Sequence, residues 1–75
     1  MATLFATERM KAERKLRTFL ARVQDEIFEY HCGDARALER AQDHGLRAIM
    51  AAVQRNEILP LIADALKMAV DTWQY

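Results

Sequence analysis

An uninterrupted apolar seam from Leu16 to Tyr30 constrains the fold of this chain more than any other stretch. Its apolar residues recur at alternating spacings of four and three, at Leu16, Leu20, Val23, Ile27 and Tyr30. No Gly or Pro interrupts the seam, and charged residues occupy many of the positions between. That period places the apolar side chains on one side of an α-helix, in the pattern of a coiled-coil seam. We therefore expect a long amphipathic helix that buries this side against a second helix.

The first helix is predicted over residues 7–32. Thr7 is its predicted N-cap, because a threonine hydroxyl can accept a hydrogen bond from a backbone amide of the first turn. Thr3 offers an alternative, earlier start. Glu13 and Arg17 stand four residues apart and predict an ion pair on the flank of this helix.

A short turn is predicted at Gly33 and Asp34. Glycine suits the left-handed backbone position just past the end of a helix, and aspartate suits the N-cap of the next helix. Because so short a connection leaves no room for a crossover, it predicts that the two helices are antiparallel neighbours.

The second helix is predicted over residues 35–55 and is apolar over an unusually wide arc. Small residues form a stripe along it, at Ala37, Ala41, Gly45, Ala48 and Ala52. This width indicates contact with two neighbours, and the small stripe lets the bulky seam of the first helix approach closely. Gly45 could instead break the helix, since Gly costs about 1 kcal/mol relative to Ala. The apolar period runs through Gly45 and favours one continuous helix.

A third helix is predicted over residues 59–74, entered at Asn56 or Leu59. Pro60 fits only the first turn of a helix and discourages helix at the residue before it. A kinked continuation of the second helix is the alternative. The sequence thus predicts an all-α fold in a single domain, residues 1–75. In it an antiparallel helical hairpin carries a shorter third helix, and self-association completes the bundle.

Composition and charge exclude several functional classes. Zero net charge gives the chain no global field that would attract nucleic acid or a membrane. The single cysteine, Cys32, cannot form an internal disulfide, and the first residues do not resemble a signal peptide. No run approaches the roughly 18 apolar residues of a membrane span. We expect a cytoplasmic protein that makes no membrane contact.

Several apolar residues lie away from the main helix faces and predict a protein interface. Exposed apolar area on a small protein marks interaction surfaces, and methionine suits surfaces that adapt to a partner. The predicted interface residues are Met10, Phe28, Met50, Leu61, Met68 and Tyr75. The expected partner is a second copy, which would form a dimer, or another protein that contributes a helix, or both.

A basic segment between Arg9 and Arg22 supports an alternative function. Lysine and arginine could contact the phosphates of a nucleic acid, and the candidate contacts are Arg9, Lys11, Arg14, Lys15 and Arg17. No recognition-helix pattern or aromatic-basic signature accompanies them. A solvated helix face, partly neutralised within the fold, explains the same residues.

Only His31, Cys32 and His44 could support metal or thiol chemistry. His31 and Cys32 are adjacent and would point about 100° apart on a helix, which does not suit one metal ion. No phosphate-binding loop, dinucleotide fingerprint or paired-carboxylate motif occurs, so we expect no enzyme, no metal and no cofactor. The expected function is non-catalytic protein binding by an adaptor, a regulator or a small chaperone-like protein. Its groove would accept a partner helix.

Overall fold

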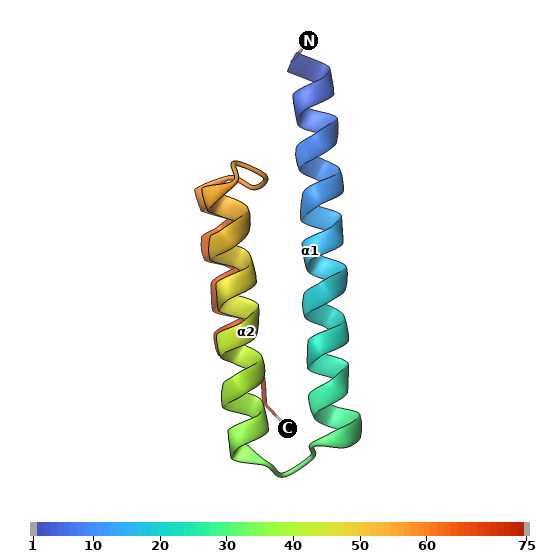
Figure 1. The fold of residues 1–75 in the computed structure, drawn as a ribbon, viewed down its shortest axis with the longest axis vertical. Helices are drawn as coiled ribbons and strands as arrows, with labels where there is room; N and C mark the ends of the chain where they lie inside the picture. The colour runs from blue at the N-terminus through green and yellow to red at the C-terminus, as the bar shows by residue number, and fades with distance from the viewer. Residues whose placement is uncertain (1, 75) are drawn as a thin grey trace.

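Three helices and no strand make up residues 2–74 of the computed structural model, and side chains are described for residues 7–74. The helices are α1 (Ala2–Tyr30), α2 (Ala35–Gln54) and α3 (Pro60–Asp71). A short turn joins α1 to the antiparallel α2, and α3 folds back along α2 (Figure 1). The prediction of an all-α fold is confirmed.

The first helix is longer at its start and shorter at its end than predicted. It begins at Ala2, so both Thr3 and Thr7 lie inside it and neither caps it. Nothing in the first residues breaks a helix, and each added residue contributes one backbone hydrogen bond. The predicted ion pair is present, with Arg17 Nη2 3.0 Å from Glu13 Oε1.

The turn between α1 and α2 has the chemistry that the sequence predicts. Gly33 adopts a φ of 86°, in the left-handed region that favours glycine. Helix α1 ends at Tyr30 and not at residue 32, because residues 31–34 form a turn in which the Asp34 amide donates to the His31 carbonyl at 3.0 Å. The Asp34 carboxylate caps α2 by accepting from the backbone amides of Arg36, at 3.0 Å, and Ala37, at 3.3 Å.

The connection from α2 to α3 reverses the chain, so α3 is a separate helix and not a kinked continuation. Asn56 takes a φ of 58°, and Leu59 precedes Pro60, the first residue of α3. The helix stops at Asp71, because the chain beyond Thr72 leaves the helical path. This end is earlier than the predicted residue 74. Trp73 still contributes to the core, since its side chain is buried although it follows the helix.

Gly45 marks the centre of the molecule, where all three helices meet. A Cβ atom built on it would lie 3.1 Å from Leu20 of α1 and 3.5 Å from Val70 of α3 and Trp73. Helix α2 runs through Gly45 without a break, which confirms the prediction of a continuous helix that touches two neighbours. The buried core consists of Leu16, Leu20, Ile27, Ile49, Ala52, Ile58, Ala63, Leu66, Val70 and Trp73.

Two predicted positions on the buried faces are wrong. Tyr30 was expected in the seam of α1 but is 73% exposed, because α2 begins only at Ala35 and leaves the last turn of α1 uncovered. On α3 the apolar period of the sequence predicts a buried face of Ile62, Leu66, Ala69, Val70 and Trp73, but Ala69 is exposed and the buried alanine is Ala63.

Helix α1 projects beyond the rest of the fold. It has 29 residues against 20 in α2, a difference of about 13 Å at 1.5 Å per residue. Figure 1 shows the start of α1 extending past the α2–α3 connection. The molecule is accordingly elongated, with principal extents of 48 × 18 × 15 Å.

Candidate interaction surface

A groove runs between α1 and α2 along one side of the hairpin. Two adjoining depressions form it, of about 410 and 570 Å³, and Phe19 lines both. We call it the α1–α2 groove. Its principal lining residues are Lys11, Ala12, Lys15, Leu16, Phe19, Arg22, Val23, Glu26, Ala37, Arg40, Ala41, Asp43, His44, Arg47, Ala48, Ala52, Arg55 and Glu57.

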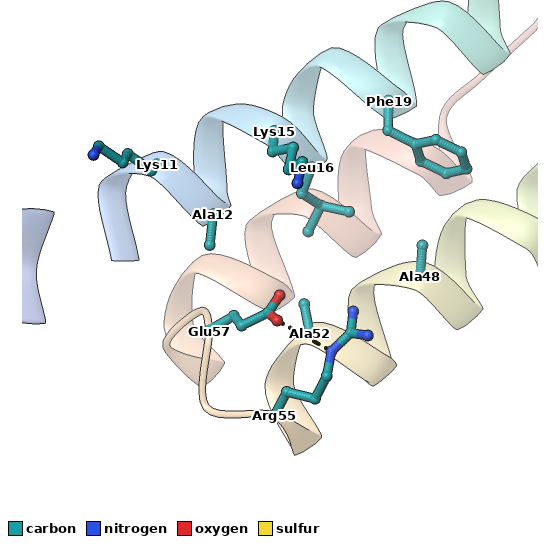
Figure 2. A pocket seen from close by; sticks show the side chains of 9 residues that line it. All are labelled: Lys11, Ala12, Lys15, Leu16, Phe19, Ala48, Ala52, Arg55 and Glu57. Atoms are coloured by element: carbon teal, nitrogen blue, oxygen red, sulfur yellow. Dashed lines mark ion pairs between the residues drawn. The ribbon is translucent and has the colours of Figure 1, made fainter. Parts of the chain in front are cut away.

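The end of the groove near the α2–α3 connection has an apolar floor. Figure 2 shows Ala12, Leu16 and Phe19 on α1 opposite Ala48 and Ala52 on α2. The alanine side chains are short, so the space between the two helices is incompletely filled. The floor is therefore apolar but open, which suits an apolar side chain from outside.

Cationic side chains border this end of the groove. Lys11 and Lys15 line it from α1, and Arg55 lines it from the end of α2 (Figure 2). The Arg55 Nε atom lies 3.2 Å from Glu57 Oε1, so this arginine has a carboxylate partner. The two lysines make no ion pair with any of the side chains described, which leaves them available to an anionic group.

The other end of the groove, toward the Gly33 turn, combines an aromatic contact with charged rims. The rings of Phe19 and His44 meet edge to face, with centroids 5.3 Å apart. Arg22 borders this end on α1, and Arg40 borders it on α2. Neither arginine has an ion-pair partner within residues 7–74, whereas Arg47 Nε lies 3.0 Å from Asp43 Oδ2. Glu26, Asp34 and Asp43 are the acidic groups in this lining.

The groove lies on the side of the hairpin away from α3. Gln42 of α2 faces α3, because its Nε2 donates to the Val70 carbonyl at 3.1 Å. His44 follows two residues later, about 200° around the helix, and lines the groove. Helix α3 therefore fills one side of the hairpin, and the opposite side has no helix across it.

The outward face of α3 is apolar and acidic. Leu61 and Met68 are 81% and 70% exposed and, with exposed Ala65, follow the i, i+4, i+7 spacing of one helix face. Asp64 and Asp71 are exposed and lie seven residues apart, so they share one flank of that face, with the half-buried Lys67 between them in sequence. The face resembles the apolar stripe of an amphipathic helix, and no other residue that the structure describes covers it.

The predicted interface residues are exposed but do not form one patch. Met10 and Phe28 lie on α1, 18 residues apart and therefore about 27 Å along its axis. Met50 lies on α2, and Leu61 and Met68 lie together on α3. All five side chains are at least 44% exposed. Tyr75 lies outside the described residues.

The predicted nucleic-acid contacts are divided between surfaces. Lys11 and Lys15 line the groove, whereas Arg17 is engaged with Glu13. Arg9 and Arg14 are exposed on α1 and do not line the groove. The five basic residues therefore do not share one continuous stripe.

The histidines and the cysteine are dispersed as well. His31 and His44 both line the groove, but His44 contacts Phe19, and Cys32 is an exposed free thiol in the turn. Among residues 7–74, no group of three or more His, Cys, Asp or Glu side chains could hold a metal ion.

The sequence analysis did not identify the second row of cations. Arg40 and Arg47 line the groove from α2 at a spacing of seven residues, as Lys15 and Arg22 do from α1. The shared seven-residue spacing was the feature of the sequence that could have indicated this second row. It could be interpreted only after the side of α2 that faces away from α3 was known.

Comparison with protein-family models, with curated proteins and with solved structures finds no match to this chain. None of the helices formed by residues 2–74 combines the length and the apolar character needed to cross a bilayer.

Proposed function

We propose that this protein is a non-catalytic interaction module whose α1–α2 groove binds an amphipathic helix with acidic residues beside its apolar stripe. The supporting observation is an apolar floor bordered by cations that lack ion-pair partners, three of them on α1 and one on α2, on the side of the hairpin that α3 leaves open. A helix laid into a groove presents anchors at i, i+3, i+4 and i+7, which suits a long, shallow site of this kind. An adaptor, a regulator or a small chaperone-like protein would use such a site.

The floor favours a helix over a flat partner surface. Phe19 and Val23 are half-buried on α1, and Ala41 and Ala48 are half-buried opposite them on α2. Short side chains on α2 leave room for larger side chains from a partner, because apolar cores are stable only when their volume is filled. Burial of apolar surface there would stabilise the complex by about 25 cal/mol for each Å² removed from water.

The rims favour an acidic partner. Lys11, Lys15, Arg22 and Arg40 have no ion-pair partner among the described side chains. Three of these cations lie on α1, so carboxylates on the flank of a bound helix that faces α1 would pair with them. Rim charges of this kind increase the association rate and the specificity more than they increase the final affinity.

Two synthetic helical peptides test this proposal. They share one apolar stripe, and one carries Glu beside the stripe where the other carries Lys. Fluorescence anisotropy should show binding of the acidic peptide and at least tenfold weaker binding of the basic one. Lys15→Glu with Arg22→Glu should weaken the acidic complex at least tenfold, by reversing one rim. Arg14→Glu with Arg36→Glu is the matched control, because both residues are exposed outside the groove. Equal binding of the two peptides, or binding of neither, contradicts the proposal.

Nucleic-acid binding through the basic segment between Arg9 and Arg22 is the alternative outcome. It would give an affinity for duplex DNA that falls steeply with salt and disappears in the variant Arg14→Glu, Lys15→Glu, Arg17→Glu. That result, without binding of the acidic peptide, would replace the proposal. Whichever ligand binds, the exposed, unpaired thiol of Cys32 suits a reducing compartment such as the cytoplasm.

A further inference from the structure

We propose that the acidic helix in the groove is the outward face of α3 from a second copy of this chain, so that copies assemble head to tail. The inference rests on the proposed function of the groove and names its occupant. The contact would join the open groove of one copy to the exposed face of α3 of another.

The apolar parts of the two surfaces complement each other in size. Leu61 and Met68 are the two most exposed large aliphatic side chains among residues 7–74, and no other described residue covers them. The groove offers space above Ala41 and Ala48, beside the half-buried Phe19. Large exposed side chains on α3 therefore meet small side chains in the groove.

The charges match in sign and in spacing. Asp64 and Asp71 of α3 lie seven residues apart, which is about 10 Å along a helix axis. Lys15 and Arg22, the unpaired cations on the α1 rim of the groove, have the same spacing; Arg40 and Arg47 on the α2 rim share it, but Arg47 is already paired with Asp43. Two helices placed side by side would bring each aspartate level with a cation of the facing rim.

The arrangement of the two surfaces determines the type of assembly. The groove faces away from α3, as the opposite directions of Gln42 and His44 show. One copy can therefore donate its α3 to a second copy and still accept the α3 of a third. Such an interface joins two different patches and generates a ring or an open chain of copies, whereas a twofold dimer would pair one patch with itself.

The contact is small. Helix α3 has 12 residues, about 18 Å, and is shorter than the stretch of α2 from Ala37 to Ala52 whose side chains line the groove. A single short helix buries less surface than a standard interface of about 800 Å² per partner. We therefore expect assembly that depends strongly on protein concentration.

Two variants, each with one surface blocked, test the inference by sedimentation velocity. Leu61→Gln with Met68→Gln removes the apolar anchors of α3 and adds no charge. Lys15→Glu with Arg22→Glu reverses one rim of the groove. The wild-type protein should grow beyond a dimer as its concentration rises, and each variant alone should remain a monomer.

An equimolar mixture of the two variants gives the decisive result. One variant keeps an intact groove and the other an intact α3, so the mixture should stop at a one-to-one dimer. Met50→Gln is the matched control for loss of an exposed apolar side chain, and Arg14→Glu with Arg36→Glu is the control for charge. Both controls should assemble like the wild type.

Three outcomes overturn the inference: a wild-type protein that stays monomeric, a wild-type dimer that grows no further, or a mixture that stays monomeric. Circular dichroism must first show that both variants keep wild-type helicity. If the groove variant loses it, Ala48→Leu, which fills the floor of the groove, replaces it. Binding of the acidic peptide by a chain that never self-associates would overturn the inference and leave the proposed function standing. Loss of both would overturn both.

Discussion

The two sides of the α1–α2 hairpin differ in how completely they are filled. On one side, Val70 and Trp73 lie close to Gly45, which has no side chain to keep them away. On the other side, the alanines of α2 face an open groove, and Phe19 is only half-buried. The same helix therefore uses small residues for two purposes.

The difference shows that a small residue alone does not indicate close packing. Gly45 has large neighbours on both adjoining helices, so its missing side chain allows contact. Ala41 and Ala48 have α1 beside them and no third helix above them, so their short side chains leave space. Changes on the filled side should alter stability, whereas changes on the open side should alter binding.

Removal of the largest side chain from the filled side should have the largest effect. Trp73→Ala should lower the free energy of unfolding by about 3–5 kcal/mol, because it leaves a cavity beside Gly45. This is a large part of the roughly 4–11 kcal/mol typical of a domain this size. Urea denaturation measures the loss. Tyr30→Ala is the matched control, since that aromatic side chain is exposed. Equal losses for the two variants would contradict the assignment of Trp73 to the core.

Addition of a side chain at the meeting point of the helices should have the next largest effect. Gly45→Leu should cost about 2–3 kcal/mol, because the added atoms collide with Leu20 and with α3. Gly45→Ala is the control. Its Cβ displaces only the flexible end of Leu20, and the helix propensity of alanine offsets that cost by about 1 kcal/mol. A leucine variant as stable as the wild type would mean that this side is not tightly filled.

A change in the turn should affect both sides equally. Gly33→Ala should cost about 1 kcal/mol, because its φ of 86° strains any residue with a Cβ atom. No atom lies within 4 Å of the added methyl group, so the cost is confined to the backbone. Thermal unfolding measures it, and Gly33→Asn should lose less because asparagine tolerates this conformation better. Binding of the acidic peptide should be unchanged; a selective loss of it would show that the turn shapes the groove.

Filling the open side should change stability least. Ala48→Leu should leave the free energy of unfolding within about 0.5 kcal/mol, since the groove has room for the added atoms. It should nevertheless abolish binding of the acidic peptide and self-association, because it occupies their site. Ala21→Leu, at an exposed position of α1 outside the groove, is the control. Normal binding by the Ala48 variant would show that partners do not enter the groove.

Local chemistry predicted much of the fold correctly. The Gly33 turn, the Asp34 cap, the Glu13–Arg17 ion pair and the continuity of α2 through Gly45 all follow from residue type and spacing, and each is present. These features depend on neighbours within one or two helical turns. The sequence pattern contains that information directly.

Features that depend on a second helix were predicted less well. Tyr30 continues the seam of α1 in sequence, but its burial depends on where α2 begins. The groove was anticipated as a feature, whereas its position and its second cationic row depend on which side of α2 receives α3. The period of a helix identifies an apolar face and does not say which neighbour covers it.

The contact of Gln42 with the end of α3 has a consequence for the order of folding. Its Nε2 donates to the carbonyls of Val70 and Asp71, at 3.1 and 3.4 Å, and so ties the end of α3 to α2. A 12-residue helix is marginal by itself in water, so α3 should form only after α2 is present to receive it. Mutations in α3 should then accelerate unfolding, whereas mutations in the hairpin should slow folding. The chain would acquire its native structure from the Gly33 turn outward, with α3 added in the last step.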